Sequence, residues 1–168
     1  MRIIGIDPGT GILGFGVIDV ADANGSRVSR PAYSMVDAGV ITTPAHTPHG
    51  ERLEDIFNSL NEIIAATKPD VMSVEKLFFT RNITTAMSVA EARGVVVLVA
   101  KLNQIPVYEY TPPQIKQTIS GYGKADKKQV QEMVRIQLNL KEAPKPDDCA
   151  DALAAAITHA AITRYQTI

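Results

Sequence analysis

The chain has 168 residues, a length that suits one domain, 1–168, with a sizeable core. Hydrophobic residues make up 45% and charged residues 21%, which is typical of a globular protein and excludes a disordered or fibrous chain. The formal net charge is −1. Taken by itself, this near-neutral total argues against a nucleic-acid partner, because domains that bind nucleic acids are usually basic.

Short β-branched runs predict three strands at 2–6, 13–20 and 34–43, with the first two in a hairpin and a polar loop at 22–31. Apolar residues at helical spacing follow from residue 51 until Pro69 ends the pattern. Strands at 71–74 and 106–110 flank a helix at 84–102, and further helices are predicted at 112–119, 126–138 and 147–164. This order predicts an α/β fold, a five-stranded mixed sheet with helices on both faces.

Four carboxylates stand in apolar surroundings. Asp7 and Glu75 each end an apolar strand, and Asp148 and Asp151 lie three residues apart at the start of the last helix. An i, i+3 pair projects from one helix face, so all four side chains could converge at one end of the sheet. Taken singly, Asp147 or Asp148 could be a helix cap and Asp7 a turn residue.

Convergent carboxylates repel one another unless a cation lies between them. Oxygen ligands without histidine or cysteine suit Mg²⁺ or Mn²⁺, and two such ions about 4 Å apart can activate water and stabilise the leaving oxygen of a phosphodiester. We therefore expect a site for two metal ions. Cys149, the one cysteine, lies between two of these residues and is expected to be a small core residue.

No leader or membrane span is expected, because Asp7 interrupts the apolar N-terminus and the longest apolar run, 94–100, is far too short for a bilayer. A single cysteine allows no intramolecular disulfide and favours a reducing compartment. We expect a cytoplasmic protein.

Five short motifs occur in order: Gly-Ile-Asp-Pro-Gly at 5–9, Val-Glu at 74–75, Ala-Arg-Gly at 92–94, Gln-Ile-Lys-Gln-Thr at 114–118 and Asp-Cys-Ala-Asp-Ala-Leu at 148–153. Together they resemble the RuvC family of bacterial Holliday-junction resolvases. The resemblance implies a ribonuclease H-like fold, a homodimer, metal-dependent cleavage of four-way junction DNA, and a branch-migration complex of RuvA and RuvB as partner. It places Asp7, Glu75, Asp148 and Asp151 on the family's catalytic acidic positions.

The basic residues gather in the middle of the chain. Residues 76–141 hold 10 basic and 4 acidic residues, whereas 1–75 hold 5 and 10. Lys127 and Lys128 fall in the first turn of a predicted helix, where a positive charge interacts unfavourably with the helix dipole. A phosphate bound at the start of this helix would make the two lysines favourable there. By resemblance, Lys116 and Lys127 match lysines that act in DNA binding or catalysis. We also expect Lys124 and Lys128 to bind DNA, although each lysine could simply be a solvated surface residue.

Two adjacent aromatic residues, Phe78 and Phe79, follow Glu75 in a polar loop. Neighbouring side chains in an extended loop point apart, so one ring could stack on an unpaired base while the other packs on the core. The resemblance places Phe78 at the junction core, and Arg81 would contact a phosphate. All three are candidate DNA-binding residues.

The helix predicted at 84–102 is unusually apolar around its circumference, which favours burial against both the sheet and a second subunit. The expected function is a structure-selective endonuclease that makes paired nicks. Two alternatives stay open: one lobe of an actin-like or sugar-kinase-like ATPase, and a non-catalytic junction-binding module.

Overall fold

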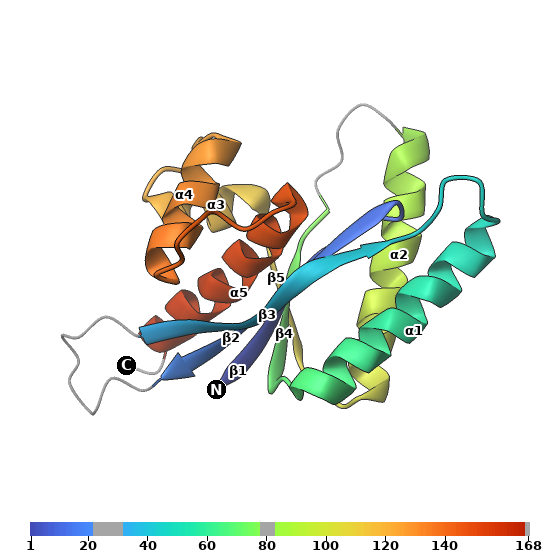
Figure 1. Cartoon of the computed structure of the whole chain (residues 1–168), viewed down its shortest axis with the longest axis horizontal. Coiled ribbons are helices and arrows are strands. Elements are labelled where there is room, and N and C mark those ends of the chain that lie inside the picture. The colour runs from blue at the N-terminus through green and yellow to red at the C-terminus, as the bar shows by residue number, and fades with distance from the viewer. Residues whose placement is uncertain (22–31, 78–82, 167–168) are drawn as a thin grey trace.

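The computed structural model describes residues 1–21, 32–77 and 83–166 (Figure 1). In these ranges, no helix is long and apolar enough to cross a bilayer. The predicted loop at 22–31 lies outside them. All ten predicted elements are present, and their ends differ from the predicted ones by no more than about two residues.

One five-stranded sheet forms the centre of the molecule, with the strand order β3-β2-β1-β4-β5. Antiparallel pairing joins β1 (Arg2–Asp7) to β2 (Ile12–Ala21), and β2 to β3 (Ala32–Thr42). Parallel pairing joins β1 to β4 (Val71–Glu75), and β4 to β5 (Val107–Tyr110). The predicted hairpin and the mixed sheet are therefore confirmed. Pro106 lies just before β5, which fits its missing N–H donor.

Helices cover both faces of the sheet (Figure 1). On one face, α1 (His49–Thr67) and α2 (Ile83–Leu102) pack over a core that includes Leu13, Leu60 and Val96. On the other face, α5 (Asp147–Gln166) lies against the sheet, with α3 (Pro112–Ser120) and α4 (Lys127–Gln137) outside it. The helix predicted from Asp126 begins one residue later, because the Asp126 side chain caps it by accepting from the backbone N–H of Gln129.

Close contact between α5 and the sheet depends on small residues. The inner part of α5 is rich in alanine and fully buried, as is Cys149, which confirms it as a core residue. Glycines on the sheet side complete the fit: a Cβ atom at Gly5 would lie 1.9 Å from the carbonyl oxygen of Ala152, and one at Gly14 would lie 2.1 Å from that of Asp148. The start of α5 is thereby fixed against the end of β1.

Candidate acidic active site

Strand register places Asp7 and Glu75 together. Ile6 pairs with Val74 across the parallel strands β1 and β4, and each carboxylate is the next residue of its strand. Burial raises the pKa of Asp7 to about 8, and three neighbouring carboxylates add to the shift, in decreasing order Glu75, Asp151 and Asp148. Burial also raises the pKa of Glu75 to about 7, with Asp151 adding to it.

The start of α5 contributes the other two carboxylates. Asp148 and Asp151 are both partly exposed and lie on the side of the helix that faces the end of β1. Burial raises the pKa of Asp151, and the positive charge of Lys127 opposes that shift. The four predicted carboxylates thus lie within electrostatic reach of one another.

The site fits a hard cation in the type of its ligand atoms. All the acidic donors are carboxylate oxygens. Burial first, and then repulsion from neighbouring carboxylates, raises the pKa of Asp7 and of Glu75, and a bound cation would oppose both effects. As the side chains stand, no three Asp, Glu, His or Cys residues within 1–21, 32–77 and 83–166 form a group that could hold a metal ion.

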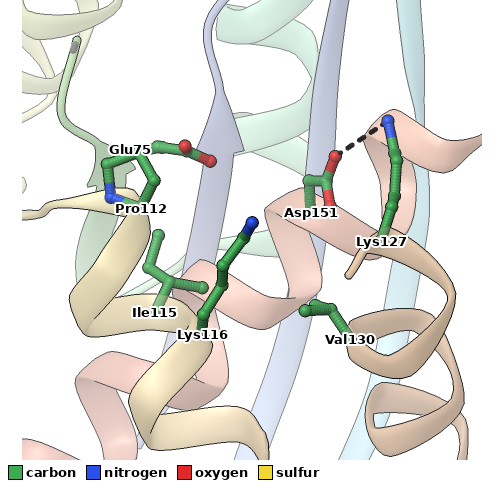
Figure 2. A pocket seen from close by; sticks show the side chains of 7 residues that line it. All are labelled: Glu75, Pro112, Ile115, Lys116, Lys127, Val130 and Asp151. Atoms are coloured by element: carbon green, nitrogen blue, oxygen red, sulfur yellow. Dashed lines mark ion pairs between the residues drawn. The ribbon is translucent and has the colours of Figure 1, made fainter. Parts of the chain in front are cut away.

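A cavity of about 230 Å³ opens beside the carboxylates, lined by Glu75, Pro112, Ile115, Lys116, Lys127, Val130 and Asp151 (Figure 2). Lys116 reaches from α3 and Lys127 from the start of α4, so that the two lysines enter from different helices. The cavity therefore combines carboxylates, two ammonium groups and an apolar floor. A phosphodiester placed there could contact both lysines.

Lys127 is the cation most tightly joined to the acidic cluster. Its Nζ atom lies 3.3 Å from Asp151 Oδ2 and 3.4 Å from Asp147 Oδ2. Burial lowers the pKa of Lys127, but the two carboxylates outweigh burial and the net shift is upward. The sequence indicated an unfavourable cation at a helix start; in the structure these carboxylates and the Asp126 cap offset that cost.

Two of the other predicted DNA-binding residues, Lys124 and Lys128, lie outside the cavity. Lys124 and Lys128 are exposed and do not line the cavity, and Lys128 instead borders a groove of about 450 Å³ beside Tyr122 and Glu132. Phe78, Phe79 and Arg81 lie outside the described residues.

A hydrogen-bonded group of polar residues, which the sequence did not reveal, supports the turn after Asp7. The Thr43 hydroxyl donates to the carbonyl oxygen of Thr10, and Arg52 Nε donates to the Thr43 hydroxyl at 2.9 Å. The Thr10 hydroxyl donates to that of Ser88 at 3.3 Å. The turn is thereby tied to both α1 and α2. Because these residues are far apart in sequence, no local pattern could have linked them.

Solved structures of similar shape define the class of fold. The chain aligns with a Thermus thermophilus RuvC structure at a TM-score of 0.89 and 38% identity, over 99% of this chain and 98% of that one. A structure of T. thermophilus RuvC in complex with Holliday junction substrate aligns at a TM-score of 0.87 and 36% identity, with the same coverage. The yeast mitochondrial Holliday junction resolvase Ydc2, at 14% identity and a TM-score of 0.61, shares the fold. These matches confirm the ribonuclease H-like α/β fold of the resolvases.

Sequence comparison gives the family. The family model described as "Crossover junction endodeoxyribonuclease RuvC" matches residues 3–159. The protein of that name from Brevibacillus brevis is 53% identical over 100% of this chain and 96% of its own length, and that from Heliobacterium modesticaldum is 53% identical over 94% and 92%. This chain belongs to the RuvC family of crossover junction endodeoxyribonucleases. The resemblance inferred from the five motifs is confirmed, and neither alternative function is favoured.

Proposed function

We propose that this chain resolves four-way DNA junctions by paired, metal-dependent nicks, for homologous recombination and DNA repair, with residues 1–168 as one nuclease domain. The observation that carries the proposal is the gathering of four carboxylates at the ends of β1 and β4 and the start of α5, opposite two lysines, in a member of the RuvC family. The ATPase alternative would need a second lobe to enclose nucleotide.

Asp7 and Glu75 would hold the metal ions, and Asp148 and Asp151 would supply further carboxylate oxygens. Two Mg²⁺ or Mn²⁺ ions would supply an activated water and charge stabilisation at the leaving oxygen. The raised pKa values of Asp7 and Glu75 support this assignment, because a cation would restore their ionised forms.

Lys116 and Lys127 bind the phosphate that is cut and offset the negative charge that develops on its oxygens. Their positions on separate helices beside the cavity support this role, since they can approach one phosphate from two directions. The bond to the 3′ oxygen breaks in line with the attacking water, which leaves 5′-phosphate and 3′-hydroxyl ends. Lys124 and Lys128 contact DNA outside the cavity, and Arg81 contacts a phosphate near the junction centre. Phe78 or Phe79 stacks on a base there.

The active form is a homodimer joined through α2, because paired nicks need two sites and a four-way junction is itself nearly two-fold symmetric. Large apolar side chains stay exposed on this helix: Met87 is 63% exposed, Leu98 51% and Leu102 61%. Gly94 lies on the same face, and a Cβ atom there would meet nothing within 4 Å. An open apolar face of this kind suits a second copy of the helix. The branch-migration proteins RuvA and RuvB are proposed partners through family membership alone.

The proposal is tested by incubating the purified protein separately with a four-way junction, a duplex of matched sequence, and ATP, each with Mg²⁺ or Mn²⁺. Symmetric, ligatable nicks in the junction alone are expected. ATP hydrolysis would favour the ATPase lobe. Junction binding without cleavage, even with Mn²⁺, would favour the non-catalytic module.

A further inference from the structure

Asp147 is an acidic residue beside the site that the proposed reaction does not use. It begins α5, next to Asp148, and makes two contacts with α4. The Nε2 atom of Gln131 donates to Asp147 Oδ1 at 2.8 Å, while Asp147 Oδ2 lies 3.4 Å from Lys127 Nζ. Lys127 and Gln131 are four residues apart and so share one side of α4. One carboxylate oxygen is thus fixed by an amide, and the other faces the lysine.

Lys127 stands between two carboxylates at nearly equal distances, 3.3 Å from Asp151 and 3.4 Å from Asp147. The two partners differ in what else they do. Asp151 is 25% exposed, lines the cavity and belongs to the proposed metal ligands, whereas the Asp147 side chain is 56% exposed and does not line the cavity. If Asp151 were engaged with a cation, Asp147 would be the remaining one of these two carboxylates to pair with Lys127.

We infer that Asp147 is a positioning residue that, held by Gln131, keeps the Lys127 ammonium at the cavity edge while Asp151 is engaged with metal. The inference rests on the proposed function, since it concerns the lysine that contacts the phosphate. We expect the Asp147–Lys127 ion pair to fix the position of the lysine side chain rather than to stabilise the fold, because half-exposed ion pairs add little to folding stability. Without Asp147, the free lysine side chain spreads over several rotamers and spends less time against the phosphate.

The effect can be separated from simple charge removal. Loss of a carboxylate close to DNA normally strengthens binding, because it removes repulsion of the phosphates. For Asp147→Asn we instead expect a single-turnover cleavage rate about 5- to 20-fold lower than wild type, with junction affinity in the absence of metal unchanged or tighter. Gln131→Ala should slow cleavage in the same way, and Asp147→Glu should recover most of the rate. The matched control is Glu51→Gln, which removes an exposed acid from the first turn of α1 and should leave cleavage unchanged.

A double-mutant cycle completes the test. In a Lys127→Met background, Asp147→Asn should slow cleavage no further, because the group that it positions is gone. The inference is overturned if Asp147→Asn cuts as fast as wild type, or if it lowers the rate equally in both backgrounds. Either result can be distinguished from a failure of the proposed function. In that case the wild-type protein would not cut the junction at all, and both the nuclease function and the role of Asp147 would be refuted.

Discussion

Replacement of Gly14 by alanine should separate junction cleavage from junction binding. Gly14 lies opposite Asp7 in the β1–β2 ladder, and a Cβ atom there would lie 2.1 Å from the carbonyl oxygen and 2.6 Å from the carbonyl carbon of Asp148. Ordinary contacts need about 3.5 Å, so the first turn of α5 must move by more than about 1 Å. That turn carries Asp148 and leads to Asp151, and both would move away from Asp7.

The expected costs of Gly14→Ala follow from this displacement. Overpacking of this kind costs about 1–3 kcal/mol of unfolding free energy. A shift of about 1 Å at a catalytic group costs about 10²-fold in rate. Single-turnover cleavage of a labelled four-way junction should therefore fall about 100-fold, while affinity for the junction, measured without metal, stays close to wild type. Thermal unfolding reports the loss of stability.

Two other glycines provide matched controls. A Cβ atom at Gly39 would lie 2.8 Å from the ring of Phe15, a residue of the core on the opposite side of the sheet, so Gly39→Ala destabilises the fold without pushing on α5. Gly50 lies in α1 with nothing within 4 Å, and Gly50→Ala should change neither cleavage nor binding. If Gly14→Ala folds and cuts within threefold of wild type, or loses no more activity than Gly39→Ala, the spacing of α5 does not control the site.

Three further predictions concern charge, the lysines and the dimer. Because the pKa of Asp7, about 8, lies above its unfolded value, the free energy of unfolding should fall as pH rises toward 8, by about 2 kcal/mol between pH 6 and pH 8. Mg²⁺ should therefore raise the melting temperature more at pH 8.5 than at pH 6. Asp7→Asn should weaken both the pH effect and the Mg²⁺ effect. A melting temperature with no such metal and pH dependence would contradict the pKa assignment. Lys116→Met should slow single-turnover cleavage about 10²-fold, unlike the exposed Lys141→Met, and equal rates for the two variants would remove Lys116 from the reaction. Leu98→Glu in α2 should give a monomer by sedimentation and abolish paired nicking. The control Ile136→Glu changes a side chain of α4 that is about equally exposed, and this variant should remain dimeric. A dimeric Leu98→Glu would exclude α2 as the interface.

The strands and the acidic residues at their ends could be predicted from sequence, because their signals are local. Asp7 and Glu75 each close an apolar run, and the carboxyl ends of parallel strands meet at one edge of a sheet. Asp148 and Asp151 share a helix face by their spacing alone. Family resemblance then gave these positions a chemistry that charge and spacing only suggested.

Other parts of the site depend on contacts between elements that lie far apart in the chain. The sequence presented Asp147 as a possible helix cap, because its contacts with Lys127 and Gln131 exist only once α4 and α5 are packed together. The spacing of Gly14 and Gly16, by contrast, is visible in the sequence. They are two residues apart in β2, so both lie on one face of the sheet, where the missing side chains leave room for a closely packed helix.

The near-neutral total charge was a poor guide to function, because it averaged two opposed groups. Residues 76–141 carry the basic excess, and Lys116 and Lys127 of that segment line the cavity beside Glu75 and Asp151. Charges of opposite sign thus meet at one site although they are separated along the chain. Their placement in the fold, which the total does not report, favours a nucleic-acid substrate.

The most direct test of the account compares binding and cleavage for wild type and Asp7→Asn, a substitution that removes the ionisable carboxyl and keeps the side-chain shape. The account predicts that the variant binds a four-way junction at least as tightly as wild type and cuts it more than about 10³-fold more slowly with Mg²⁺ or Mn²⁺. Cleavage within tenfold of wild type would contradict a metal-dependent centre built on Asp7. Loss of junction binding in a folded variant would equally contradict it, because Asp7 would then serve recognition rather than chemistry.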